Sequence, residues 1–293
     1  MSAYWLNLSP FFLLGAGILS VWGSSRFPVW LVFLLAACGL GWYLGLIGPM
    51  ALAALGILLL TTFIANTSQW GVPLRILGYV ATFVLALALA LHYVPGFPRP
   101  VLISERLGDS RALYTMYANF DKGAAGLILI ALWAHTHKSG GALASLLGRN
   151  LPWILLAAAV PVAVAWWLGL RLDFKLGWYT PVFLMVNLLF VCVAEEIFFR
   201  QMVQQPLMNR LGATGGGAFM ATLLTALAFA LAHFGLLKIF SGDAAAKALS
   251  VTFIAGFAYA WVYQMSRSVE CSIATHFLVN AIHFIAFQYP MRW

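Results

Sequence analysis

Long apolar stretches, separated by short polar segments, follow one another along almost the whole chain. Ten of them approach the roughly 20 residues that an α-helix needs to cross the hydrocarbon of a bilayer. Because a backbone in lipid must satisfy its own hydrogen bonds, we expect helices and an all-α, polytopic transmembrane bundle of about 8–10 spans. The expected spans are 4–22, 27–46, 48–66, 73–94, 122–137, 151–170, 179–199, 217–235, 246–266 and 270–287.

Two of these stretches need a comment. No Lys or Arg precedes the first, and Arg26 is the first positive charge of the chain. Since a cleaved signal peptide needs a basic start, we expect residues 4–22 to be a retained helix. The fifth stretch, 122–137, is short for a span, and we expect it to be partly re-entrant.

Composition agrees with a membrane protein. Of the 293 residues, 63% are hydrophobic and 8% charged, and the mean hydropathy is +0.93. The net charge of +8 fits loops that touch anionic lipid headgroups and requires no nucleic acid. Lys and Arg are shared almost evenly between alternate loops, so they do not fix the orientation in the membrane. Cys38, Cys192 and Cys271 have no paired spacing and indicate neither disulfides nor a zinc cluster.

The longest polar stretch, 95–122, divides the chain into two expected domains. Residues 1–95 hold four helices with few charges, and we interpret them as scaffold. In this part His92 stands at an expected helix end and is interpreted as an interfacial residue. Residues 96–293 carry the candidate chemistry.

A pair of acids ends the apolar run 179–199. Glu195 and Glu196 are its only charged residues, and Arg200 follows four positions after Glu196. On an α-helix that spacing permits an ion pair between Glu196 and Arg200 and directs Glu195 toward another part of the bundle. A charge at the centre of a membrane helix costs roughly 2.5–3.5 kcal/mol, so the pair indicates a functional site.

Two later spans add histidines and an amide. His233 follows Phe229 by four residues near the end of one apolar helix. In the last span His276 and Asn280 have the same spacing, and His283 continues their face. A carboxylate beside an imidazole can take a proton from water, and donors from His276 and Asn280 can stabilise an oxyanion. No hydroxyl or thiol nucleophile is needed for such a hydrolysis.

The three patterns, Glu-Glu-x-x-x-Arg at 195–200, Phe-x-x-x-His at 229–233 and His-x-x-x-Asn at 276–280, resemble the signature motifs of the CPBP family. This family comprises the CAAX prenyl endopeptidases of the Ras-converting type and their bacterial relatives, the glutamic intramembrane proteases. The resemblance covers about residues 120–287 and makes the first four helices an N-terminal extension. It implies an endopeptidase of the bacterial cell membrane that needs no cofactor.

The resemblance also implies roles for the catalytic residues. Glu195 activates water with help from His233, Glu196 pairs with Arg200, and His276 and Asn280 bind the oxyanion. The expected partners are membrane lipids and a membrane-associated protein or peptide that is lipidated or carries a C-terminal hydrophobic sorting helix. The segment 117–122 is similar to bacterial branches that act in C-terminal protein sorting, although Asp121 and Lys122 also fit an ion pair at a helix start.

Other functions stay open on the sequence alone. Two histidines and a glutamate can hold catalytic zinc, so His233 and His276 permit a zinc protease, although no His-Glu-x-x-His motif is present. A membrane scaffold or immunity-type protein would keep the same residues as a binding pocket, and a proton-coupled carrier would also need intramembrane acids. Cys192 as a nucleophile is a further alternative.

Overall fold

The computed structural model describes residues 2–23, 28–110, 112–134, 136–137, 139–235 and 239–289, with side chains from residue 6 onward. Arg26 lies outside these residues. Within the described ranges, seven helices are long and apolar enough to span a membrane, and the chain is an all-α, multi-pass membrane protein. These helices are Pro49–Asn66, Val72–Ala90, Gly140–Trp167, Tyr179–Leu211, Gly215–Ala232, Gly242–Ser266 and Val269–Ala286.

The other expected spans are also helices. Val29–Tyr43 is apolar and has 15 residues, and the apolar residues 6–20 belong to a helix of 19 residues, Ser2–Ser20. The fifth expected stretch forms a helix of 14 residues, Phe120–Trp133. Large apolar side chains such as Leu77 and Leu156 are exposed on the helices, as lipid-facing residues are.

The chain forms two compact units that interleave along the sequence. The first contains residues 1–101, 117–143 and 188–198, and the second contains 102–116, 144–187 and 199–293. Both units take residues from the long helix Tyr179–Leu211. A functional boundary at residue 95 stays a prediction.

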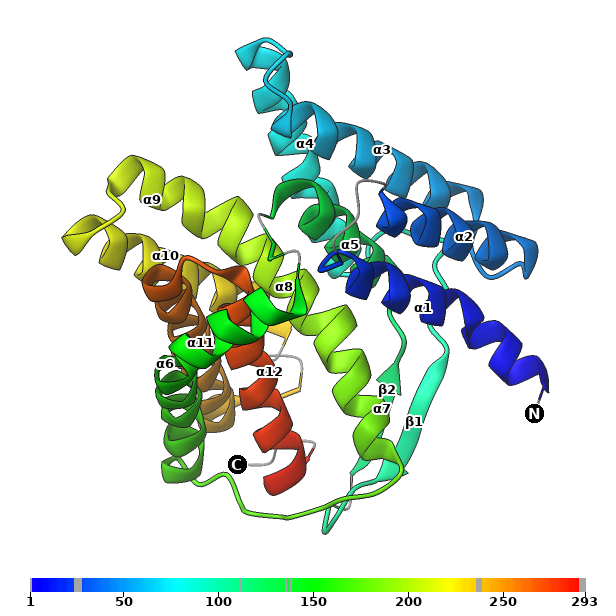
Figure 1. The fold of residues 1–293 in the computed structure, drawn as a ribbon. Helices are drawn as coiled ribbons and strands as arrows, with labels where there is room; N and C mark the ends of the chain where they lie inside the picture. The colour runs from blue at the N-terminus through cyan, green and yellow to red at the C-terminus, as the bar shows by residue number, and fades with distance from the viewer. Residues whose placement is uncertain are drawn as a thin grey trace. The chain divides into compact units, whose positions relative to one another are not determined.

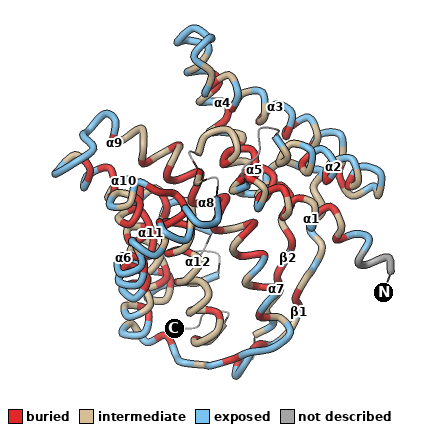
Figure 2. The backbone as a smooth tube through the Cα atoms, viewed as in Figure 1, coloured by how far each residue is buried: buried red, intermediate tan, exposed pale blue. Residues whose placement is uncertain are grey.

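The first unit is built around one buried helix. α5 packs against α1, α3, α4 and α8, and nearly all of its first eleven residues are buried, as Figure 2 shows. Small residues make this burial possible, because α5 begins Phe-Asp-Lys-Gly-Ala-Ala-Gly. The helices of this unit are α1 Ser2–Ser20, α2 Val29–Tyr43, α3 Pro49–Asn66, α4 Val72–Ala90, α5 Phe120–Trp133 and α8 Val193–Ile197.

The second unit is a helical bundle with a small hairpin. α11 packs against α10 and α12, α9 packs against α10, and α12 contacts α7. The hairpin, formed by β1 Val101–Arg106 and β2 Leu113–Tyr117, lies in the polar stretch for which the hydropathy pattern predicts no span. The helices are α6 Gly140–Trp167, α7 Tyr179–Val186, α9 Gln205–Leu211, α10 Gly215–Ala232, α11 Gly242–Ser266 and α12 Val269–Ala286.

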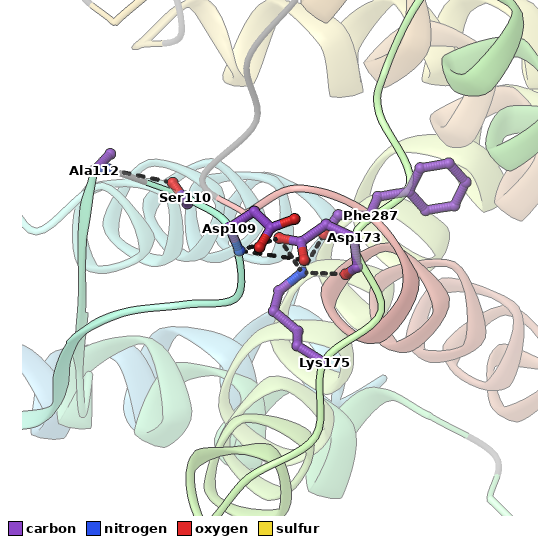
Figure 3. A network of polar contacts seen from close by, with 6 residues as sticks. All are labelled: Asp109, Ser110, Ala112, Asp173, Lys175 and Phe287. Carbon is purple, nitrogen blue, oxygen red and sulfur yellow. Dashed lines mark hydrogen bonds and ion pairs between the residues drawn. The ribbon is translucent and has the colours of Figure 1, made fainter.

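A polar network ties the loops of this second unit together (Figure 3). Asp173 accepts hydrogen bonds from the Asp109 backbone amide, 3.3 and 3.2 Å from its two oxygens. Lys175 Nζ lies 3.6 Å from Asp173 Oδ2 and donates to the carbonyls of Asp173 and Phe287. Burial lowers the pKa of Lys175 below its ordinary value, and Asp173 opposes that shift. The network therefore joins the hairpin loop, the segment before α7 and the end of α12.

The helix that carries the glutamates departs from regular α geometry. Figure 1 shows it running without a break from α7 through α8 to α9. Two π-helical stretches, Asn187–Cys192 and Phe198–Gln204, flank α8. A π turn closes with i→i+5 hydrogen bonds, so residues four apart no longer stack as on an α-helix. The α-helical spacing expected from Glu196 to Arg200 is therefore interrupted.

Candidate active site

Both glutamates of the first motif lie in α8, within the first unit. The Glu196 side chain is 0% exposed, and the Glu195 side chain is 13% exposed. Carboxylates this deep have lost most of their water and need compensating partners. π-helical turns are rare in proteins, and those that occur are often found at functional sites. Two of them flank α8, the helix that carries the two glutamates of the motif.

Glu195 has a partner that the sequence pattern did not indicate. Lys122 Nζ of α5 lies 2.5 Å from Glu195 Oε1, and the Lys122 side chain is also 13% exposed. The two residues are 73 positions apart in the chain. Residue spacing predicts contacts only within one helix, so it does not predict this one. The contact depends on how α5 packs against α8.

Asp121, next to Lys122, has a different partner. His92 Nδ1 donates to Asp121 Oδ2 at 2.7 Å, and Asp121 is 1% exposed. The expected ion pair between Asp121 and Lys122 is thus replaced by two separate contacts, one to His92 and one to Glu195. His92, expected as an interfacial residue, compensates a buried acid at the first turn of α5.

Arg200 begins the polar contacts of the second unit. Its side chain is 0% exposed, and Nη1 donates to Gln204 Oε1 at 2.7 Å. Gln204 in turn donates to the Ala260 carbonyl at 2.7 Å and to Thr222 Oγ1 at 3.3 Å. Arg200 is therefore held in a network that reaches α10 and α11. Its pairing with Glu196 stays a prediction.

His233 follows the last residue of α10, and one ring nitrogen has a defined role. Nδ1 lies 2.7 Å from the Phe229 carbonyl oxygen, which can only accept, so Nδ1 carries the hydrogen. In the neutral ring the lone pair then sits on Nε2. The four-residue spacing of Phe229 and His233 thus sets the tautomer of the histidine.

His276 of α12 is packed among aromatic rings. Its ring stacks on Tyr259 of α11, with centroids 4.4 Å apart and planes at 13°. Phe229 contacts both histidine rings, His233 at 4.5 Å and His276 at 5.9 Å between centroids. Gly256 leaves room for the Phe229 ring, because a Cβ at position 256 would lie 2.8 Å from that ring. The apolar residue of the second motif therefore packs against the histidines of the second and third.

Asn280 contacts the start of the first π-helical stretch. Its Nδ2 donates to Asn187 Oδ1 at 3.3 Å. Asn187 is buried and uncharged, so the pattern of charges in the span 179–199 does not indicate it. A polar side chain near the centre of an apolar run is the signal that indicates Asn187.

The structure thus forms two groups of site residues. Glu195 and Glu196, with Lys122, belong to the first unit, and Arg200, His233, His276 and Asn280 belong to the second. Among the described residues, no cluster of three or more His, Cys, Asp and Glu is arranged to hold a metal ion. Cys192 is buried.

Comparison with known families identifies the segment that carries these residues. Residues 177–282 match the family model described as Type II CAAX prenyl endopeptidase Rce1-like. Comparison with curated proteins gives no match, and comparison with solved structures gives none either. Residues 177–282 are thus similar to the Rce1-like CAAX prenyl endopeptidases, the family that the three motifs resemble.

Proposed function

We propose that this protein is a glutamic intramembrane endopeptidase, which hydrolyses a peptide bond near the C-terminus or membrane segment of a membrane-associated protein. One observation carries the proposal. All six motif residues lie within 177–282, the segment that matches the endopeptidase family model. They are Glu195, Glu196, Arg200, His233, His276 and Asn280.

The chemistry needs no covalent intermediate. Glu195 takes a proton from a water molecule, and the resulting hydroxide attacks the carbonyl carbon of the scissile bond. The negative charge that develops on the carbonyl oxygen is stabilised by donors from His276 and Asn280. The proton then passes to the leaving amine as the C–N bond breaks. His233 assists the proton transfers, and Glu196 with Arg200 orients the site.

The substrate class follows from the same family. We propose substrates that reach the enzyme through the membrane, either as a lipidated CAAX-type C-terminus or as a protein with a C-terminal hydrophobic sorting helix. The net charge of +8 suits loops that contact anionic headgroups, which supports a protein that meets its substrates at the membrane.

A single substitution tests this function. Glu195→Gln removes the base while keeping the shape of the side chain, so kcat should fall by about 10²–10⁴-fold, the contribution of a general base. The measurement compares the C-termini of membrane proteins between the wild-type strain and the variant strain. The kcat of the purified proteins is then measured on a farnesylated CAAX reporter peptide and on a reporter with a C-terminal hydrophobic helix.

Glu105→Gln is the matched control, because Glu105 lies on β1 and carries no proposed role. It should process both reporters as the wild type does. Unchanged C-termini in the Glu195→Gln strain, at normal protein level, would contradict the proposed function and favour a scaffold.

A further inference from the structure

The contact between Lys122 and Glu195 joins two helices at the proposed catalytic base. Lys122 Nζ and Glu195 Oε1 are 2.5 Å apart, and both side chains are largely buried. A charge-assisted hydrogen bond between an ammonium and a carboxylate is roughly twice as strong as one between neutral groups. The ammonium therefore compensates the carboxylate and restricts the directions in which it can point.

Backbone packing beside the pair fixes its geometry. Gly126 lies one turn after Lys122 on the same face of α5. A Cβ at Gly126 would lie 2.8 Å from Ala194 Cβ and 2.9 Å from Ala194 Cα, and Ala194 directly precedes Glu195. α5 thus approaches α8 so closely that only glycine fits. The close packing of Gly126 against Ala194 brings Lys122 next to Glu195.

The first turn of α5 is anchored on its other side. Asp121 Oδ2 accepts from His92 Nδ1 at 2.7 Å, and Asp121 Oδ1 accepts from the Lys122 backbone amide at 2.8 Å. Phe120 is fully buried and its ring packs edge-on against Phe11 at 5.6 Å. The backbone of Lys122 is therefore held by its neighbours, and its side chain is directed at one carboxylate.

We propose that Lys122 is a positioning residue for Glu195, whose ammonium orients the carboxylate for water activation. This inference rests on the proposed function, because it assigns Lys122 a role through the base. Lys122 lies outside the segment 177–282 that matches the family model, and the motifs do not contain it. The first unit thereby contributes a residue from α5 to the chemistry of α8.

The test uses the purified full chain and whichever reporter peptide the wild type cleaves. In Lys122→Met the carboxylate loses its orientation, and kcat should fall on the order of 10²-fold with KM little changed, as misplacement of a reacting group predicts. Lys122→Arg keeps a cation at this position and should retain most of the wild-type kcat. A residue that only stabilised the fold would not lower kcat selectively while KM stays little changed.

A double substitution separates positioning from folding. Lys122→Met removes the ammonium that contacts a buried carboxylate, so the thermal unfolding midpoint should fall well below that of the wild type. In Lys122→Met combined with Glu195→Gln neither buried charge remains, so the midpoint should rise above that of Lys122→Met and lie at or above that of Glu195→Gln, which still buries the Lys122 ammonium. Lys247→Met is the control, since Lys247 forms an ion pair with the exposed Asp243 within α11 and should leave kcat unchanged.

The outcomes distinguish the two proposals. If Glu195→Gln abolishes cleavage but Lys122→Met keeps the wild-type kcat, the positioning role is wrong and the proposed function stands. Equal losses of kcat in Lys122→Arg and Lys122→Met also overturn it, as does a midpoint of the double variant no higher than that of Lys122→Met. If Glu195→Gln cleaves as the wild type does, the proposed function itself fails.

Discussion

Acidic side chains buried in this protein have partners of different kinds. Asp121 has a histidine, Glu195 a lysine from another helix, and Asp173 a lysine close in sequence. A carboxylate that has lost its water is destabilising unless such a partner is present. Polar residues within membrane helices are therefore expected in pairs, and their partners indicate which segments pack together.

Tyr259 is the residue whose effect on the histidines is simplest to test. Tyr259→Leu removes the ring that stacks on His276, an interaction worth about 1 kcal/mol, so kcat should fall about five-fold. Tyr259→Phe keeps the ring and should stay within about two-fold of the wild type. Cleavage of the reporter peptide measures both. Equal activity of the two variants would show that the stacking does not orient His276.

The helix that carries the glutamates combines two backbone geometries. α8 keeps α-helical hydrogen bonds, and the segments on both sides are π-helical. Pro206 lacks the amide that would bond to the Met202 carbonyl, so a regular α pattern cannot continue through 202–206. The π-helical stretch Phe198–Gln204 lies where the α-helical hydrogen bonding is interrupted. α5 meets this helix through glycine, which makes the contact sensitive to a single methyl group.

Gly126→Ala tests the close contact of α5 with α8. The new Cβ would meet backbone and Cβ atoms of Ala194 at under 3 Å, so the helices must separate. We expect a loss of about 1–3 kcal/mol in the free energy of unfolding, and lower kcat because Lys122 moves away from Glu195. Thermal unfolding in detergent measures the first and reporter cleavage the second.

Gly39→Ala is the control for this substitution. Gly39 lies in α2, and a Cβ there would have no atom within 4 Å. Alanine should therefore leave stability unchanged or raise it by up to about 1 kcal/mol, its advantage over glycine in a helix. Equal stability of the Gly126→Ala and Gly39→Ala proteins would refute the close packing.

Across the whole molecule, the segment that matches the endopeptidase family contributes to both compact units. Its residues 188–198, with the two glutamates, pack in the unit that also contains the N-terminal helices. His92, which lies in the segment interpreted as scaffold, contacts Asp121 beside Lys122. Deletion of residues 1–95 would remove His92 and its contact with Asp121.

A chelator separates the glutamic mechanism from a zinc mechanism. If carboxylate and histidine activate the water, cleavage of the reporter by the purified protein should persist at full rate in excess EDTA. A zinc protease that uses His233 and His276 would lose activity and regain it when zinc is added. That second result would reverse the assignment of Glu195 as the base.

Hydrophobic patterning was sufficient to predict the fold class, because a backbone in lipid has few alternatives to the helix. The six motif residues were also readable, since charged or polar side chains in apolar runs are rare. Spacing could not reveal Lys122 as the partner of Glu195, Tyr259 as the neighbour of His276, or the π-helical turns around α8. These depend on how helices far apart in sequence pack together, and periodicity along one helix carries no information about its neighbours.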